Sequence, residues 1–153
     1  MAETSAVERL YREQVERLWR SVVLFAGDRE VANDAVAEAF AQLLHRGGEV
    51  RAPDRWVWRA AFRIAAGELK ARRRPPLPLP EPDPAPETPI DLLGMLGRLS
   101  PKQRSSVVLH HYAGYSVREV AAIVGSTPSA VGVHLHRARR RLRELLKEED
   151  DDA

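Results

Sequence analysis

The sequence predicts an all-α protein of two small helical domains joined by a proline-rich linker, with a helix-turn-helix as the second domain. In both halves of the 153-residue chain, apolar residues recur every three or four positions, as on one face of a helix. Eight prolines fall within residues 75–89, where they remove amide donors and prevent a regular helix. We therefore expect domains at residues 1–74 and 91–147, a linker at 75–90 and an acidic tail at 148–153.

The first domain is expected to contain three helices. The first ends at Gly27, because glycine tolerates the left-handed conformation that closes many helices. A second follows Asp28 and stops at Gly47 and Gly48, and a third runs from about Pro53 to Arg73. The apolar stripe that predicts the first helix consists of Val7, Tyr11, Val15, Leu18, Val22 and either Phe25 or Ala26.

The second domain has clearer helix boundaries. Ser100–Gln103 and Ser116–Glu119 both match the capping box, in which the side chains at the first and fourth positions bond to each other's backbone amides. The first box opens a helix to about Tyr112. The second opens a short helix that ends at Gly125. This arrangement, followed by a longer basic helix, predicts a helix-turn-helix.

The last helix is expected to run from Thr127–Pro128 to about Lys147, with one apolar and one polar face. The apolar face holds Val131, Leu135, Ala138, Leu142, Leu145 and Leu146. Because the start of such a helix enters the DNA major groove, the candidates for contacting base edges are Ser129, Val133, His136 and Arg137. Phosphate contacts are expected further along, at Arg139, Arg140, Arg141 and Arg143. The alternative is a solvated basic helix in a bundle.

The third helix carries a second cationic face. Its basic residues fall within one arc and are Arg55, Arg59, Arg63, Lys70, Arg73 and Arg74. Trp56 and Trp58 lie between these arginines, and aromatic rings beside positive charge suit single-stranded nucleic acid, whose bases stack on rings. The alternative is that both tryptophans belong to the core.

Charge is distributed in blocks that the net charge of +2 conceals. Residues 51–74 hold 8 basic and 2 acidic side chains, and residues 98–147 hold 10 and 2, whereas the rest of the chain is acidic. Two separate cationic blocks indicate two contacts with a polyanion. Solvated helix faces are the alternative.

Other functional classes find little support. The chain has no cysteine, which excludes disulfides and thiolate metal sites and fits the reducing cytoplasm where we expect the protein. No apolar run is long enough for a membrane span. No phosphate-binding glycine loop, nucleophile motif or metal-ligand spacing appears, although His110, His111, His134 and His136 invite a metal hypothesis. We expect neither enzymatic activity nor a cofactor.

Residues 99–104, 114–125 and 137–143 carry sequence motifs that, together with Asp34–Phe40 and the helix from Arg55, match one protein family. They resemble region four of the extracytoplasmic-function family of bacterial RNA polymerase sigma factors. Asp34–Phe40 resembles the polymerase-binding helix of region two, and Arg55–Ala61 through Arg74 resembles the strand-opening helix that follows. The resemblance covers nearly the whole chain in the family's order.

The resemblance implies a role for each segment. Asp34, Glu38 and Gln42 would bind the clamp of the polymerase β′ subunit. The loop Arg46–Asp54 and the helix from Arg55 would melt the minus-ten element and capture flipped bases, while the last helix would recognise the minus-thirty-five duplex. The partners implied are core RNA polymerase, through its β′ and β subunits, promoter DNA and a separate anti-sigma protein.

Some positions depart from the family's usual residues. The family commonly has Asn at Arg63 and Asp at Gly67, and often Gln at Ala37. In the last helix it commonly has Lys, Ser and Arg at Gly132, Val133 and His134. Two further function classes therefore stay open beside a promoter-recognising sigma factor. One is a non-sigma helix-turn-helix regulator, and the other is a degenerate sigma-like protein that acts through protein contacts.

Overall fold

The computed structural model describes residues 2–72 and 91–152, which are helical apart from short connections. Within these ranges no strand is present, so the all-α prediction is confirmed. The predicted linker and the basic residues Arg73 and Arg74 lie outside the described residues. The helices are α1 (Ala2–Ala26), α2 (Arg29–Arg46), α3 (Pro53–Ala71), α4 (Leu92–Gly97), α5 (Pro101–Val107), α6 (Val117–Val124) and α7 (Pro128–Asp152), with a 3₁₀ turn η1 (Gly47–Glu49) and a π-helical segment η2 (Val108–Tyr112).

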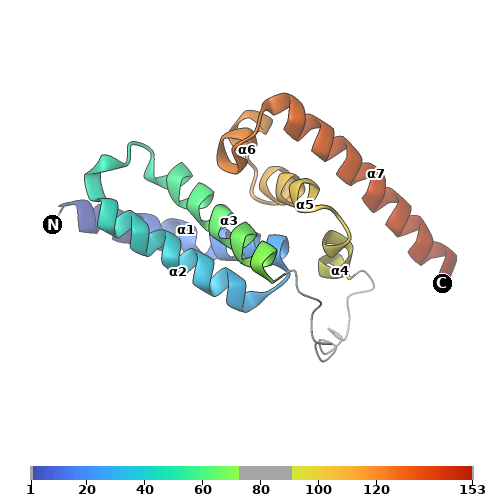
Figure 1. Cartoon of the computed structure of the whole chain (residues 1–153), viewed down its shortest axis with the longest axis horizontal. Coiled ribbons are helices and arrows are strands. Elements are labelled where there is room, and N and C mark those ends of the chain that lie inside the picture. The colour runs from blue at the N-terminus through green and yellow to red at the C-terminus, as the bar shows by residue number, and fades with distance from the viewer. Residues whose placement is uncertain (1, 73–90, 153) are drawn as a thin grey trace.

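Helices α1, α2 and α3 pack on one another as the first domain (Figure 1). Gly27 ends α1 with φ 69°, as expected. The Asp28 carboxylate then accepts hydrogen bonds from the amides of Glu30 (2.8 Å) and Val31 (3.1 Å), which satisfies two free donors at the start of α2. The core between the three helices includes Leu18, Val22, Phe25, Val31, Val36, Leu43, Val57, Trp58 and Phe62.

Two aromatic residues of this domain are placed differently from what the sequence suggested. Tyr11 is 48% exposed, although it belongs to the apolar stripe of α1; its ring meets Phe40 edge to face at 5.0 Å. Trp58 is fully buried, and its indole N–H donates to the Gln14 side chain at 3.2 Å. Trp58 is therefore a core residue and cannot stack on a nucleic-acid base.

Helices α4 to α7 form the second domain. Both predicted capping boxes are present, at Ser100 with Gln103 and at Ser116 with Glu119. The helix that begins at Pro101 changes to π geometry over η2 before it ends, whereas the sequence predicted one regular helix. The short helix α4 was not predicted; the Asp91 carboxylate caps it by accepting from the Gly94 amide at 3.0 Å.

Helix α7 follows the predicted turn. Gly125 adopts φ 71° and ends α6, and the Thr127 hydroxyl accepts from the Ala130 amide at 3.1 Å to begin α7. α7 continues to Asp152 instead of ending near Lys147. Leu146 is 41% exposed and so lies outside the core stripe predicted for this helix.

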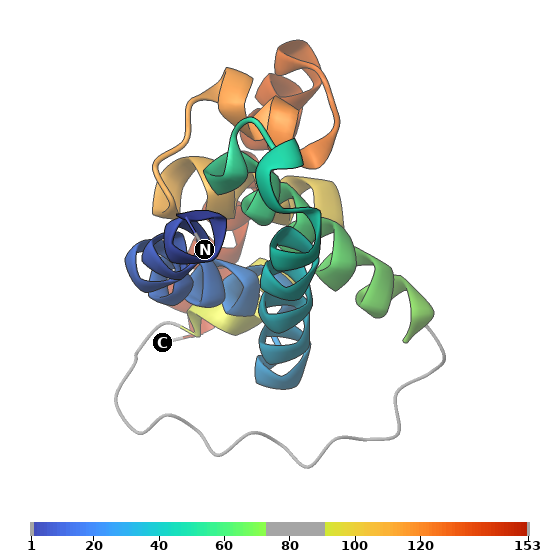
Figure 2. The ribbon, with the colours of Figure 1, turned by 90° about the vertical axis from the view of Figure 1, so that its left-hand side faces the viewer.

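The two domains pack against each other, which the sequence did not predict. α3 lies against α6, and α1 contacts α4, α5 and η2. Figures 1 and 2 show the C-terminal helices beside the first domain, with α7 along the outer edge in Figure 1. In the described part of the chain, no helix is long and apolar enough to cross a membrane.

Candidate nucleic-acid interface

The first candidate surface is the start of α7. Val131, Leu135 and Ala138 are buried toward α5 and α6, which turns the opposite face of α7 to the solvent. That face exposes the predicted base contacts Ser129, Val133, His136 and Arg137, together with the predicted phosphate contact Arg140. Val133 is 46% exposed, so its methyl groups are open to an external partner. The helix therefore presents hydroxyl, apolar, imidazole and guanidinium groups together.

The charges on this surface are available to an external partner. Arg137 forms no ion pair with any described residue. Arg140 and Arg141 lie 3.9 Å and 3.4 Å from Glu144, but these are exposed contacts within one helix that solvent weakens. The pKa of His134 is lowered by partial burial and then by the nearby charges of Lys102 and Arg137, so this imidazole is held neutral among cations.

The second candidate surface is the outer face of α3. Arg55, Arg59, Arg63 and Lys70 are all exposed there, and the buried Val57, Ala61 and Ala65 anchor the opposite side. Trp56 is half-buried beside them, with the guanidinium of Arg46 5.5 Å from the centre of its ring. Trp56 thus keeps part of an aromatic face near the cationic stripe, whereas Trp58 does not.

The third candidate surface lies on α2. Asp34, Glu38 and Gln42 are exposed along one side of the helix, and the Gln42 amide donates to Glu38 at 3.0 Å. On another side of α2, α1 and α2 enclose an open groove of about 560 Å³. Its apolar lining includes Val7, Tyr11, Val15, Trp19, Val36, Phe40 and Leu44. The three predicted polymerase-binding residues do not line this groove, although the same helix contributes to it.

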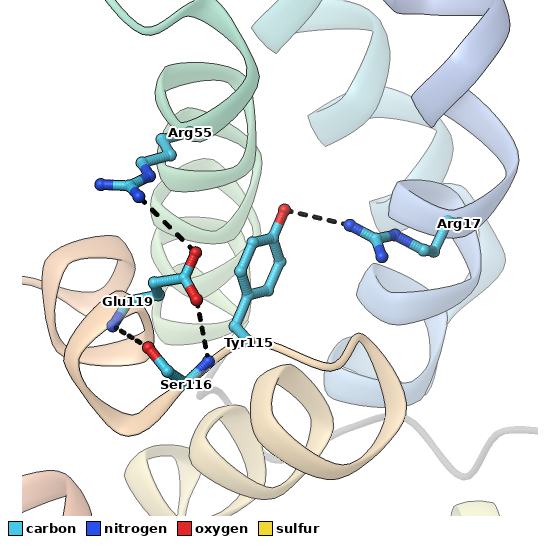
Figure 3. Close-up of polar contacts among 5 residues, drawn as sticks. All are labelled: Arg17, Arg55, Tyr115, Ser116 and Glu119. Carbon is cyan, nitrogen blue, oxygen red and sulfur yellow. Dashed lines mark hydrogen bonds and ion pairs between the residues drawn. The ribbon is translucent and has the colours of Figure 1, made fainter.

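Where the two domains meet, Arg17 of α1 contacts the connection between η2 and α6 (Figure 3). Its guanidinium donates to the backbone oxygen of Ala113 at 3.0 Å and to the hydroxyl oxygen of Tyr115 at 3.2 Å. It also lies 5.0 Å from the Trp58 ring centre and 5.3 Å from that of Tyr115. The Tyr115 ring in turn meets Trp58 edge to face at 5.1 Å.

Glu119 connects the same region to α3. One carboxylate oxygen accepts from the Ser116 amide at 3.1 Å in the capping box, and the other lies 3.7 Å from the Arg55 guanidinium (Figure 3). The hydrogen bonds at Ser116 lower the pKa of Glu119, and Arg55 lowers it further. Burial raises the pKa of Tyr115, while the Arg17 charge opposes that change.

Two hollows lie along the boundary between α3 and α6. One, of about 370 Å³, is lined by Arg59, Arg63 and Phe62 on one side and by Lys102 and Ile123 on the other. The other, of about 390 Å³, is lined by residues that include Arg55, Trp56, Arg59, Ala122 and Ile123. The predicted nucleic-acid residues of α3 thus border the contact with the second domain.

Sequence reasoning did not single out Arg17 or Tyr115 and treated Glu119 only as a helix cap. The contacts of Arg17 join residues 96 and 98 positions apart, and no local spacing signals such a pair. Glu119 could have been noticed from the sequence, because residues 98–147 hold only two acidic side chains.

The histidines are held by local contacts. His110 donates through Nδ1 to the Tyr115 backbone oxygen at 2.7 Å, and the Arg139 side chain lies 3.4 Å from His111. Burial lowers the pKa of His111, and the charges of His110 and Arg139 add to this effect. Within residues 2–72 and 91–152, no group of three or more potential ligands could hold a metal ion.

Comparison with known proteins agrees with this arrangement. Residues 90–142 match the family described as Sigma-70, region 4. The chain is 32% identical to the RNA polymerase sigma-E factor of Streptomyces coelicolor over 167 aligned positions, which cover 100% of this chain and 93% of that protein. It is 28% identical to the ECF RNA polymerase sigma factor SigL of Mycobacterium tuberculosis, with 96% and 92% covered.

Solved structures show the same fold. The sigma factor RpoE from Bartonella quintana, solved in complex with the anti-sigma factor NepR, superposes with a TM-score of 0.74 at 21% identity over 92% of this chain and 96% of that one. CnrH, solved with the cytosolic domain of CnrY, gives 0.71 at 22% identity over 95% and 90%. The full-length identity to a sigma factor and the match to region four together show that this chain belongs to the extracytoplasmic-function family of RNA polymerase sigma factors.

Proposed function

We propose that this protein binds core RNA polymerase and directs it to promoters, with the first domain opening the minus-ten element and the second recognising the minus-thirty-five element. The observation that carries the proposal is the exposed face of α7, which combines groups for base contact with arginines that lack a strong internal partner. Membership of the sigma family excludes the alternative of an unrelated helix-turn-helix regulator.

Recognition of the minus-thirty-five duplex is assigned to α7. Arg137 can donate two parallel hydrogen bonds to guanine, and the exposed methyl groups of Val133 can contact a thymine methyl. Ser129 and His136 flank them on the same face. Arg140, further along the helix, serves phosphate binding, which fixes position but carries little sequence information.

Opening of the minus-ten element is assigned to α3. Each stacking step that is opened costs about 1.4 kcal/mol, and a flipped base costs a few kcal/mol more. Arg55, Arg59, Arg63 and Lys70 can recover part of this energy through phosphate contacts. The half-buried Trp56 offers a ring for stacking. The rest must come from polymerase, so the free protein is expected to open DNA poorly.

Polymerase binding is assigned to α2. Asp34, Glu38 and Gln42 are exposed on α2, which also contributes to the apolar groove between α1 and α2. A helical segment of the β′ clamp with basic and apolar residues would complement both parts of this surface. The linker, with Glu81, Asp83 and Glu87 among its prolines, is proposed to pass along the RNA exit path near the β subunit.

Reconstitution with core polymerase tests the proposal. Run-off transcription from a promoter library, followed by sequencing of the transcripts, should show initiation at a shared pair of sequence elements. Glu38→Lys should abolish binding to core polymerase, whereas Arg137→Ala should retain binding and lose selectivity. If the wild-type protein binds polymerase but starts no transcript, the degenerate sigma-like alternative is correct.

An anti-sigma protein is proposed as a second partner, because one structural relative described above was solved with an anti-sigma factor and the other with the cytosolic domain of another protein. It would cover the groove on α1 and α2 or the basic faces of α3 and α7. Purification of the native protein from resting cells tests this directly. Recovery with core polymerase and no other protein would argue against it.

A further inference from the structure

The contact between the two domains uses the side of α3 that is proposed to bind the minus-ten element. Arg55, Trp56, Arg59 and Arg63 all line the hollows between α3 and α6. In this closed arrangement the second domain stands beside the α3 face, where an opened DNA strand would have to lie. The second domain and nucleic acid therefore compete for the same surface.

Glu119 brings an anionic group to that surface. Its carboxylate lies 3.7 Å from the guanidinium of Arg55, and its other oxygen is fixed by the Ser116 amide. Carboxylates and phosphates accept the same charge-assisted hydrogen bonds from a guanidinium. Glu119 thus supplies from within the chain the kind of partner that a DNA phosphate would otherwise supply.

Arg17 and Tyr115 hold the neighbouring part of the contact. Arg17 reaches the Tyr115 hydroxyl and the Ala113 backbone oxygen, and its guanidinium lies close to both the Tyr115 and Trp58 rings. Trp58 is part of α3 and is fully buried. The same few residues therefore join α1, α3 and the start of α6.

The closed arrangement cannot serve both promoter elements together. Elements centred near minus ten and minus thirty-five are about 25 base pairs apart, or about 85 Å at about 3.4 Å per base pair. α6 packs on both α3 and α7, and packed helices lie about 8–10 Å apart. The two DNA-binding helices are then separated by about 20 Å at this contact, so the domains must part before both elements are bound.

We propose that Arg17 with Tyr115 and Arg55 with Glu119 form an interdomain latch that keeps the free protein closed and competes with nucleic acid for α3. This inference rests on the proposed role of α3 in promoter opening. The latch consists of polar and cation–π contacts, which contacts to water or phosphate can replace when the domains part. The ion pair is partly exposed, at 58% for Arg55 and 35% for Glu119, and such pairs change an equilibrium by about fivefold at most.

Arg104 of α5 lies where the second domain contacts α1. Its guanidinium lies over the Phe25 ring across the same boundary, at 5.3 Å. Its Nε atom is buried without a hydrogen-bond acceptor among the described residues, and burial lowers the pKa of this side chain. The cation–π contact with Phe25 favours closure, whereas a buried donor without a partner costs free energy.

The first test measures the distance between the domains in the free, full-length protein. Because the chain lacks cysteine, two spin labels can be attached through Glu13→Cys on α1 and Lys147→Cys on α7, which are both exposed. Tyr115→Phe keeps the ring but removes the hydroxyl that Arg17 contacts. Glu119→Gln keeps the capping box, which accepts glutamine, but removes the charge.

Double electron–electron resonance spectroscopy of the labelled protein should give one short, narrow distribution of distances between the two spin labels. The double variant Tyr115→Phe, Glu119→Gln should move at least part of that distribution to longer distances, with about a tenfold change in the closed-to-open ratio. Arg17→Gln, a change at an exposed position, should give a shift of the same direction. An unchanged distribution in all variants, or a broad one in the wild-type protein, overturns the latch.

The second test measures binding of the free protein to a random-sequence single-stranded oligonucleotide by fluorescence anisotropy. The double variant should bind about five to ten times more tightly. Glu16→Gln is the matched control, because it removes one negative charge from an exposed ion pair with Arg20 within α1, and neither residue is assigned to nucleic-acid binding. An equal gain in the control would show an effect of net charge and reject the competition with DNA.

The two measurements separate this inference from the proposed function. Longer label distances without tighter DNA binding would overturn the competition with DNA but leave a structural contact. Failure of the wild-type protein to support transcription with core polymerase would count against the proposed function and would leave the label distances unaffected.

Discussion

Gly132 offers a prediction whose size follows from the structure. It lies in the interior of α7, and a methyl group built on it would have no atom within 4 Å. Glycine in a helix interior is less favourable than alanine by about 0.5–1 kcal/mol, because it loses more backbone freedom on folding. Gly132→Ala should therefore raise the free energy of unfolding by that amount, which is about 1–4 °C in melting temperature for a chain of this size.

Gly125→Ala is the matched control for this substitution. Gly125 also has open space around it, but its φ of 71° lies in the left-handed region. An alanine there should destabilise the protein by about 1–2 kcal/mol. Thermal and urea unfolding of the full chain, followed by circular dichroism, give both changes. A destabilised Gly132→Ala variant would refute the reasoning, because it would show that the open space and regular helix assigned to this position are incorrect.

The same position connects stability to DNA binding. The family commonly has lysine there, and Gly132 is exposed at the start of α7 near the proposed DNA-contacting residues. Gly132→Lys in the polymerase complex should add one phosphate contact. The slope of log K against log salt would then steepen by about 0.9. Gly132→Ala should leave that slope unchanged, so the pair separates helix stability from phosphate contact.

Three further predictions concern recognition, melting and pH. Arg137→Ala should weaken binding of the polymerase complex to the minus-thirty-five duplex by about 1–3 kcal/mol and relax base preference there; unchanged affinity and preference would remove Arg137 from this role. Arg59→Ala combined with Arg63→Ala should reduce promoter opening more than polymerase binding, and normal permanganate reactivity of the minus-ten bases would contradict it. The pKa of Glu119 is lowered from 4.5 by its hydrogen bonds at Ser116, so its contribution to stability is present above that value and is lost as pH falls through the lowered pKa. The difference in melting temperature between wild type and Glu119→Gln should therefore be constant near neutral pH and shrink in acid, and a constant difference throughout would disprove the assignment.

Local sequence signals predicted the helix boundaries well where a cap is specified by a few adjacent residues. Asp28 caps α2, Ser116 and Glu119 form their box, and Gly125 takes the left-handed conformation, because each of these interactions forms within four residues. Helix α4 was missed because its short length gives too little periodicity to recognise. The extension of α7 to Asp152 was missed as well, and its end gains one long-range ion pair, between Arg98 and Glu148 at 3.9 Å.

The candidate site was predictable to the extent that exposure follows helical periodicity. Arg59 and Arg137 point to solvent because the residues on the opposite faces of their helices form the core. Trp58 shows the limit of this reasoning, since its place beside arginines suggested stacking while its position on the helix buries it completely. The packing of the domains depends on a contact between segments nearly 100 residues apart, so no pattern within either domain could reveal it.

If core polymerase binds α2 as proposed, it can reach the closed protein without disturbing the proposed latch. Asp34, Glu38 and Gln42 are exposed on α2, which packs on α1 and α3 and leaves this side free, whereas the latch joins α1 and α3 to the second domain. If polymerase binds the closed and open forms equally, releasing the latch will not change its affinity. If it binds only the open form, the apparent dissociation constant equals the dissociation constant of the open form divided by the fraction of protein that is open. The affinity of Tyr115→Phe, Glu119→Gln for core polymerase, compared with that of the wild type, therefore decides whether polymerase docking precedes domain opening or requires it.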